Sequence, residues 1–576
     1  MVYCLSDNII SPLGTSTSEN YSAIKNGQSA LMQYTQRWEI PEPFTASLFS
    51  EQQIESLSVS GFSRFESIVL NSAKKALAEA KINVANDRTV FILSTTKADV
   101  ELLGCAPIAE EDLDPGVVAK RIATRLDIVT EPIVVCNACI SGVSALVLAY
   151  RLLEAGTYDY AIVCGADVQC KFTISGFSSL KALSPNQCQP FDIERMGLNL
   201  GEAAATMVLS SKRESCLSGN ASWAIYNGAI RNDCFHVSSP SKNGEGATMA
   251  LQSVLDGVDV NDLALINAHG TATMFNDQME SVAIERAGLN SVPVNGLKGY
   301  IGHTLGAAGI IETIITMASL NDGTVLGTRG YNECGVSGKI SISSENINTT
   351  KRGFIKMISG FGGNNAAILM GDAEEAQKSE PKRINEKKTA IEIVNSLRLT
   401  PTDLTINDQP IEVNHTGLEL LNWLYKTYMG DYPKYYKMDG LSRLGLISAE
   451  LLLRQEGRER FVPCDDRAVI LFNKSSSIVS DRKFLETITG EDNYFPSPSV
   501  FIYTLPNLVA GEIAMRNKYH GETSFYISSK RDDDMALEVI TSAFSDKTTN
   551  SVLGGWIDYR NDNCFEADLF IAKLKY

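Results

Sequence analysis

The stretch VVCNACISG at residues 134–142 joins an apolar β-type run to a cysteine and a group of small residues. The run ends just before Cys139, and the pattern predicts that a buried helix begins just after it. The free N–H groups and the dipole of a helix N-terminus favour thiolate over thiol. Cys139 is therefore predicted to be a nucleophile, whereas most of the twelve cysteines are expected to be small buried hydrophobes.

Cys136 and Cys139 also form a Cys-x-x-Cys pair, which in other chains is a redox motif. A thioredoxin-like protein would be a small domain with this pair near its start. The rest of this chain does not supply such a domain, so the redox interpretation is the less favoured of the two.

Two of the five histidines stand in frames of glycine and small residues. His269 lies in NAHGTAT at 267–273, and His303 lies in KGYIGHTLGAAG at 298–309. Loops at strand ends often carry catalytic groups in open α/β folds. The second motif begins with Lys298, whose apolar and glycine-rich neighbours predict a buried, paired lysine.

Composition excludes several classes of protein. The 576 residues carry a formal net charge of −17, which argues against a nucleic-acid binder. The scattered cysteines and the start MVYCLSDNII predict a cytoplasmic chain without a signal peptide. The uncharged stretch 132–150 is interpreted as a strand followed by a buried helix, so no stable membrane insertion is expected.

Strand-like runs alternate with helical patterns up to about residue 370, which predicts an α/β fold with covered sheets. Residues 371–390 are charged and poor in large apolar side chains, and we interpret 373–390 as a linker. The predicted domains are therefore 1–372 and 391–576.

The second domain repeats short sequence motifs of the first. GFSRF at 61–65 opens a helix that leads to DRTVFIL at 87–93, and GLSRL at 440–444 opens one that leads to DRAVILF at 466–472. The separation between the two parts of the motif is the same in both copies. Such self-similarity predicts a repeated structural unit.

The order Cys139, His269, Lys298, His303 and then GFGG at 360–363 resembles a β-ketoacyl-acyl-carrier-protein synthase, one of the condensing enzymes. The resemblance runs from about residue 2 to 372. It implies the thiolase-like fold, an αβαβα layered core of two similar α/β halves, at about 1–210 and 211–372.

The resemblance also implies roles. Cys139 would carry an acyl group, and its backbone N–H would form an oxyanion hole with that of the gating residue Phe361. His269 and His303 would stabilise the enolate left by decarboxylation of a malonyl thioester. Further positions would bind the pantetheine arm or order the site: Thr271 and Thr273 for the arm, and Lys298, Glu280, Glu312 and Asn364 for support.

The same resemblance implies acyl carrier protein as the partner, which supplies the phosphopantetheine, and no cofactor bound by the chain itself. Malonyl and acyl thioesters would be the substrates. The sequence departs from the family's usual pattern at two positions. Ala272 stands where glycine is commoner, and Leu198 stands where a bulkier aromatic residue is frequent.

The segment 391–576 resembles the N-terminal half of a ketosynthase without its nucleophile, an additional half-thiolase-like domain. Its motifs place Lys530 where Cys139 stands in the first domain, and no cysteine lies between Cys464 and Cys564. It is similar to a chain-length factor of the aryl polyene pigment type. The chain would then be its own ketosynthase/chain-length-factor pseudo-dimer, with further homo-oligomers left open.

Two other interpretations stay open. The chain could be an ordinary fatty-acid elongating synthase whose tail is only structural. It could also be a non-enzymatic scaffold that binds carrier protein, although such a module needs no Cys139, His269 or His303.

Overall fold

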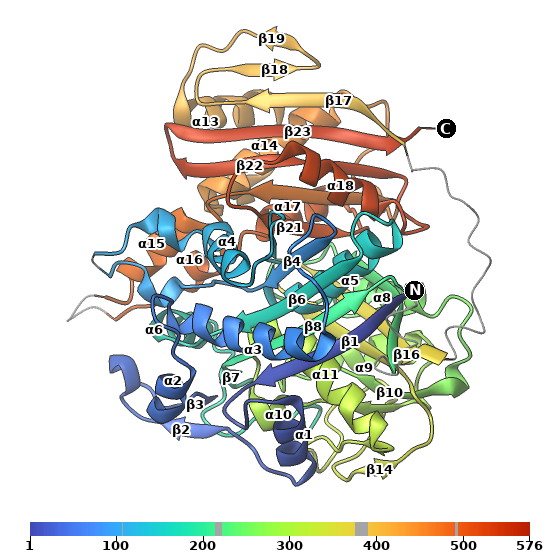
Figure 1. Ribbon diagram of the computed structural model, residues 1–576. Coiled ribbons are helices and arrows are strands. Elements are labelled where there is room, and N and C mark those ends of the chain that lie inside the picture. Colours follow the sequence, from blue (N-terminus) through green and yellow to red (C-terminus); the bar gives the residue numbers. More distant parts are fainter. Residues whose placement is uncertain (106, 213–221, 375–389, 490–493, 576) are drawn as a thin grey trace.

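The computed structural model describes residues 1–105, 107–212, 222–374, 390–489 and 494–575. Within them the same five-stranded pattern occurs three times (Figure 1). In the first unit β4 pairs in parallel with β5 and β6, β6 pairs antiparallel with β8, and β8 pairs antiparallel with β1. The strands are β1 (Val2–Ile10), β4 (Thr89–Ser94), β5 (Ile133–Val135), β6 (Tyr160–Asp167) and β8 (Ala203–Ser210).

The second unit has the same connections. Strand β10 pairs in parallel with β11 and β15, β15 pairs antiparallel with β16, and β16 pairs antiparallel with β9. A short sixth strand extends the edge at β11. The strands are β9 (Trp223–Asn232), β10 (Leu263–Asn267), β11 (Pro293–Asn295), β13 (Ser341–Ile342), β15 (Gly353–Gly360) and β16 (Asn364–Asp372).

The third unit, called the C-terminal unit below, repeats the pattern of the first. Strand β20 pairs in parallel with β21 and β22, β22 pairs antiparallel with β23, and β23 pairs antiparallel with β17. The β18–β19 hairpin extends its outer edge. The strands are β17 (Ile391–Leu399), β18 (Leu404–Ile406), β19 (Gln409–Ile411), β20 (Arg467–Asn473), β21 (Thr523–Ile527), β22 (Ser551–Asn561) and β23 (Cys564–Leu574).

Helices separate and cover the sheets. Helices α5 and α11 lie between the first two sheets, α3 covers the outer face of the first, and α8 with α9 covers the outer face of the second. This order is the predicted αβαβα layering, which is confirmed. The bounds are α3 (Arg64–Ala80), α5 (Ser141–Glu154), α8 (Glu245–Val254), α9 (Met274–Arg286) and α11 (Ala308–Asn321).

The helices of the C-terminal unit follow the same scheme on a smaller scale. Helices α14 and α17 pack together on one face of its sheet, and α18 lies against α5 of the first unit. Shorter helices complete both parts of the chain. The bounds are α4 (Pro115–Arg125), α6 (Lys171–Ser179), α13 (Gly417–Tyr428), α14 (Gly440–Leu453), α15 (Ile478–Glu486), α16 (Pro498–Ile502), α17 (Leu508–Asn517) and α18 (Asp533–Ala543).

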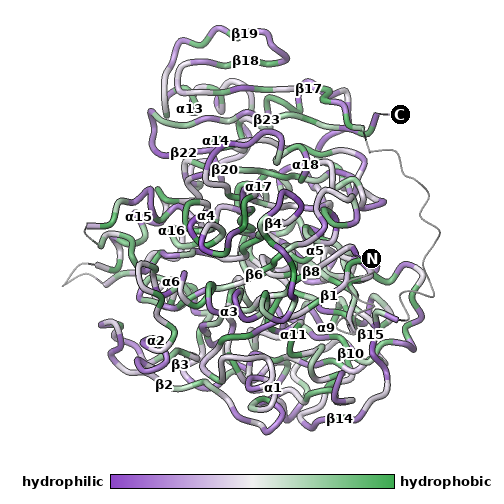
Figure 2. The backbone as a smooth tube through the Cα atoms, viewed as in Figure 1, coloured by the Kyte–Doolittle hydropathy of each residue, from purple (hydrophilic) through white to green (hydrophobic). Residues whose placement is uncertain are grey.

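The first and third sheets join edge to edge. Strand β5 pairs antiparallel with β21, with Val135 opposite Tyr526 and Val134 opposite Ile527. The apolar core continues through this junction, because one cluster of buried side chains contains Val134 together with Phe525 and Leu508. Hydrophobic stretches accordingly run through the middle of the molecule, while much of the outer loops is hydrophilic (Figure 2).

The strand and helix bounds correct one predicted position. Cys139 lies four residues beyond the end of β5 and two before the start of α5. Arg531 lies four residues beyond the end of β21 and two before the start of α18. Arg531, and not Lys530, is therefore the counterpart of Cys139. Its guanidinium pairs with Asp533, Glu566 and Asp568, so the position carries an ion-pair network and no nucleophile.

Most of the predicted linker falls on 375–389, outside the described residues, so the boundaries at 372 and 391 stay predictions. The uncharged stretch 132–150 contains β5 and most of α5, as expected. Among the described residues, no helix has the length and apolar character needed to span a membrane.

Candidate active site

Cys139 is presented by a strained turn between β5 and α5. Ala138 takes a left-handed conformation with φ of 50°, which L-residues adopt only at a cost in energy. The Ser141 hydroxyl closes the turn, since it accepts from the Asn137 N–H at 2.8 Å and donates to the Ala138 carbonyl at 2.6 Å. The C-terminal unit holds the same turn, because the Phe525 N–H donates to Asn137 Oδ1 at 2.6 Å.

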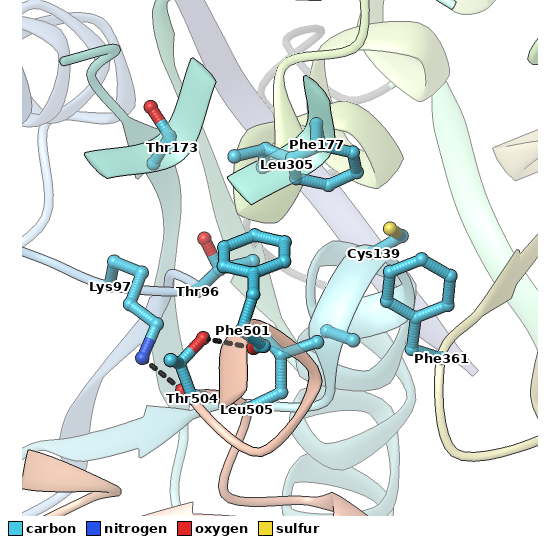
Figure 3. Close-up of a pocket in the computed structure, with 11 residues that line it drawn as sticks. Thr96, Lys97, Cys139, Thr173, Phe177, Leu305, Phe361, Phe501, Thr504 and Leu505 are labelled. Atoms are coloured by element: carbon cyan, nitrogen blue, oxygen red, sulfur yellow. Dashed lines mark hydrogen bonds between the residues drawn. The ribbon is translucent and has the colours of Figure 1, made fainter. Parts of the chain in front are cut away.

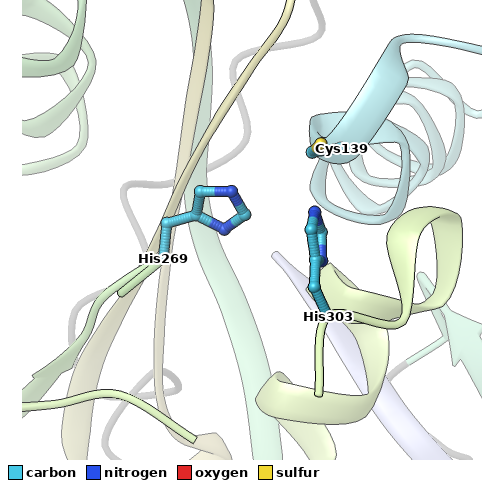
Figure 4. A group of neighbouring side chains, drawn as sticks. All are labelled: Cys139, His269 and His303. Carbon is cyan, nitrogen blue, oxygen red and sulfur yellow. The ribbon is translucent and has the colours of Figure 1, made fainter. Parts of the chain in front are cut away.

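The structure brings Cys139, His269 and His303 together, although they come from three separate loops (Figure 4). One nitrogen of each ring and the Cys139 sulfur lie within 4.8 Å of one another. The two imidazole rings meet edge to face with centroids 5.0 Å apart. All three side chains are buried.

The hydrogen bonds of His303 decide how it can act. The Leu305 N–H donates to Nδ1 of His303 at 3.3 Å, so the ring proton belongs on Nε2. That buried Nε2 has no partner among the described residues. It is therefore a free N–H donor aimed into the site, whereas a metal ligand would need a lone pair at this atom.

Burial controls the charges in the site. It lowers the pKa of both imidazoles well below the ordinary value, and the ammonium of Lys298 acts in the same direction. Burial also raises the pKa of the Cys139 thiol to about 12, against the opposing effect of Lys298. Burial therefore outweighs the effect of the helix start, which by itself favours the thiolate. All three groups are neutral at neutral pH.

The loop that carries His269 is held by a carboxylate from α9. Glu280 accepts from the N–H groups of His269 and Gly270 at 2.7 and 2.8 Å. The hydroxyls of Thr271 and Thr273 lie 2.9 Å apart. Between them, Ala272 has a φ of 60°, which explains why glycine is the commoner residue there.

A second lysine, which the sequence analysis missed, lies beneath His269. Lys298 Nζ donates to Glu312 Oε1 and to the His269 carbonyl, each at 2.6 Å. Lys356 Nζ pairs with the other Glu312 oxygen and donates to the Ala268 carbonyl at 3.1 Å. All three ionic side chains are fully buried. The only signal in the sequence was a lysine inside an apolar strand run.

Phe361 follows β15 and reaches the site from the second unit. The end of β15 lies against the Cys139 turn, since a side-chain carbon at Gly360 would come within 3.3 Å of the Cys139 nitrogen. The Phe361 ring stacks on Phe177, with centroids 6.2 Å apart. The backbone carbonyl of Phe361 accepts a hydrogen bond from the Asn507 side chain of the C-terminal unit at 2.9 Å.

Asn364 lies farther along the same turn. It accepts from Asn232 at 2.9 Å and also from the Thr523 hydroxyl of the C-terminal unit. It therefore stabilises the junction of the units, and neither of these hydrogen bonds reaches Cys139. Leu198 packs in the apolar cluster that contains Phe177 and is not among the cavity-lining residues.

A narrow cavity opens beside Cys139 and is bounded by both parts of the chain (Figure 3). Phe177, Leu305 and Phe361 belong to the first two units. Phe501, Thr504 and Leu505 belong to the C-terminal unit. The Phe501 ring fits only because residue 176 is glycine, as a side-chain carbon there would lie 2.0 Å from the ring.

The five-layered αβαβα fold with a buried Cys-His-His site defines a thiolase-like ketosynthase. The family descriptions agree: "Beta-ketoacyl synthase, N-terminal domain" matches residues 6–215 and "Beta-ketoacyl synthase, C-terminal domain" matches residues 224–332. Together they cover more than half of the chain, and the chain belongs to the β-ketoacyl synthase family.

Among curated relatives, a 3-oxoacyl-[acyl-carrier-protein] synthase 2 of Rhizobium meliloti (strain 1021) is 32% identical over 255 residues. The match covers 41% of this chain and 59% of the relative, so the chain spans somewhat more than half of that protein's length.

Two solved structures share the fold. "PfaC Keto synthase-Chain length factor" has a TM-score of 0.79 at 14% identity, and the match covers 100% of this chain and 78% of that chain. A type II polyketide ketosynthase solved with its acyl-carrier protein, AntDE:AntF, has a TM-score of 0.57 at 21% identity. That match covers 64% of this chain and 98% of the other.

Proposed function

We propose that the chain is a decarboxylating condensing enzyme that extends an acyl thioester by two carbons from malonyl-acyl-carrier protein. The observation that carries the proposal is the meeting of Cys139 with two neutral imidazoles at the wall of an internal cavity. The matched family supports the same reaction. We place it in the cytoplasm, because the reaction requires Cys139 as a free thiol and that compartment keeps thiols reduced.

The first step loads the enzyme. The Cys139 sulfur attacks the thioester carbonyl of the acyl donor, the bond from carbon to the pantetheine sulfur breaks, and the departing sulfur ends with the Cys139 proton. The developing oxyanion would be stabilised by the N–H groups of Cys139 and Phe361, which lie on two adjacent turns. One such donor is typically worth about 2.7–4 kcal/mol.

The second step forms the new carbon–carbon bond. The malonyl C–C bond breaks, carbon dioxide leaves, and the electron pair forms an enolate. Its carbon attacks the acyl carbonyl on Cys139, the bond to sulfur breaks, and the returned thiolate takes up a proton. The free N–H on His303 Nε2 and the imidazole of His269 suit the enolate, because a neutral donor stabilises the oxyanion without protonating the carbanion.

The carrier protein would supply the phosphopantetheine arm of both substrates. Thr271 and Thr273 are proposed to hydrogen-bond that arm, since their hydroxyls lie in the loop that carries His269. The AntDE:AntF complex, in which a ketosynthase of the same fold is bound to its acyl-carrier protein, supports this partner.

The C-terminal unit is proposed to be a non-catalytic partner that limits chain length. Arg531 replaces the nucleophile, and Phe501, Thr504 and Leu505 close the cavity that starts at Cys139. One chain would thus act as a ketosynthase/chain-length-factor pair. Assignment of the product to an aryl polyene or related pigment pathway stays a prediction.

Replacement of Cys139 by alanine tests the reaction. The purified variant, incubated with acyl- and malonyl-carrier protein, should show no acyl adduct by intact-mass analysis and no condensation product. Cys136→Ala is the matched control, because it changes the neighbouring buried thiol and should still load. An acyl adduct on the Cys139→Ala variant would refute the proposal.

A further inference from the structure

Lys97 is a buried lysine whose ammonium crosses from the first unit into the C-terminal unit. It follows β4, and its side chain is 6% exposed. Nζ donates to Asp481 Oδ1 at 2.5 Å, to Ser477 Oγ at 3.2 Å and to the Thr504 carbonyl. All three partners belong to the C-terminal unit, so each unit supplies one member of a buried ion pair.

The stem of Lys97 stands between two cavities. The first is the cavity beside Cys139, where Lys97 lies on the side away from the sulfur (Figure 3). The second is a cleft between the units, lined by the apolar side chains of Val100, Leu103 and Ile478 and by Asp114, Ser475 and Asp481. Lys97 is the one residue that lines both.

We propose that the Lys97–Asp481 pair is a plug that ends the acyl cavity and sets the longest acyl group that Cys139 can carry. This inference rests on the proposed condensing function and assigns its length limit to particular side chains. A chain growing away from Cys139 meets the Lys97 stem, and behind it lies the second cleft. The ammonium is tied down by three acceptors, so a growing alkyl chain cannot displace it without leaving Asp481 buried and unpaired.

The charges of Lys97 and Asp481 explain why this pair can form a rigid end to the acyl cavity. A buried carboxylate with a lysine partner is held in one geometry only while both members stay together. Burial raises the pKa of Asp481 to about 6 even though Lys97 opposes that shift, so the carboxylate depends on this ammonium to stay ionised. The end of the cavity is therefore rigid, whereas the wall near Cys139 is built from apolar rings.

The test is a paired substitution that removes the plug without stranding a charge. In Lys97→Ala/Asp481→Ala the four-carbon stem is gone, and the two cavities should join. Acyl groups longer by about two to four carbons should then load on Cys139. Each methylene that enters a buried apolar space favours loading by about fourfold. Loading of the longest groups should therefore rise by at least about tenfold.

The control keeps the volume and removes the charges. Lys97→Met/Asp481→Asn should shift the length limit less than the alanine pair does, because the unbranched methionine fills the same space but lacks the ion pair that ties it down. The readout is intact-mass analysis of Cys139 after incubation with a series of acyl-carrier proteins of increasing chain length. Wild-type rates with the shortest acyl group show that each variant is folded.

Two results would contradict the proposed plug. In the first, the alanine pair keeps the wild-type limit on acyl length. In the second, the methionine control shifts that limit as far as the alanine pair does. A wild-type chain that takes up no acyl group at all would instead refute the condensing function and the plug with it. The two failures are therefore distinguishable.

Discussion

The ion pair between Arg231 and Asp546 offers a quantitative test of how the C-terminal unit is held. Arg231 Nη1 and Nη2 donate to the two Asp546 oxygens at 2.6 and 3.1 Å. The side chains are 1% and 8% exposed. Although burial alone would raise the pKa of Asp546, the Arg231 guanidinium, helped by Arg151 and the Thr548 N–H, lowers it from 3.8 to about 2.

Because the pKa of Asp546 is lower in the folded than in the unfolded chain, its ionisation contributes to the free energy of unfolding. A fall of about 1.8 pH units at about 1.36 kcal/mol each gives about 2.4 kcal/mol for the ionised form of Asp546 in this site. Because the folded pKa is the lower one, this stabilisation is complete above about pH 4. It is lost as the pH falls towards 2. Asp546→Asn should therefore lower the free energy of unfolding at pH 7 by about 2–4 kcal/mol, the upper end reflecting the stranded Arg231.

Urea unfolding of wild type and variant at several pH values measures the difference directly. It should be constant from pH 8 to 5 and should shrink as the pH falls below 4. Asp256→Asn is the matched control, because Asp256 and Lys547 form an exposed pair across the same junction and its loss should change nothing measurable. A difference that is absent at pH 7, or equally large at pH 3, would refute the reasoning.

Two further predictions concern the site. Burial raises the pKa of Cys139 to about 12, so its alkylation rate should climb about tenfold per pH unit between pH 7 and 9; a plateau in that range would contradict the argument. Lys356→Met should move the acid limb of malonyl decarboxylation to higher pH, because the Lys356 charge is one cause of the lowered pKa of His269 and that ring must stay neutral. Lys351→Met, on an exposed lysine nearby, is the control, and an unmoved pH profile in the Lys356 variant would count against a positioning role.

The sequence predicted the local elements of this protein well. Strands and helices such as β4, α5 and α11 follow from apolar runs and their periodicity, and the repeat of GFSRF in GLSRL predicted a third related unit. The glycine-rich frames around His269 and His303 also indicated functional loops. These features depend on neighbours within one segment, which is the range over which a sequence pattern acts.

The contacts between distant segments came from the tertiary structure alone. Lys356 lies 58 residues beyond Lys298, and both meet Glu312 only because the second sheet packs on α11. The bounds of β21 and α18 decided that Arg531, not Lys530, takes the place of the nucleophile.

Burial decided the charges in the same way. The helix start at Cys139 is visible in the sequence, but the pKa of the thiol depends on how completely the surrounding units exclude water. Sequence by itself thus determined which chemical groups this protein brings and the local turns that carry them. The packing of three units determined which groups meet, what charge they hold and where the cavity ends, because desolvation and side-chain contact arise only from the assembled layers.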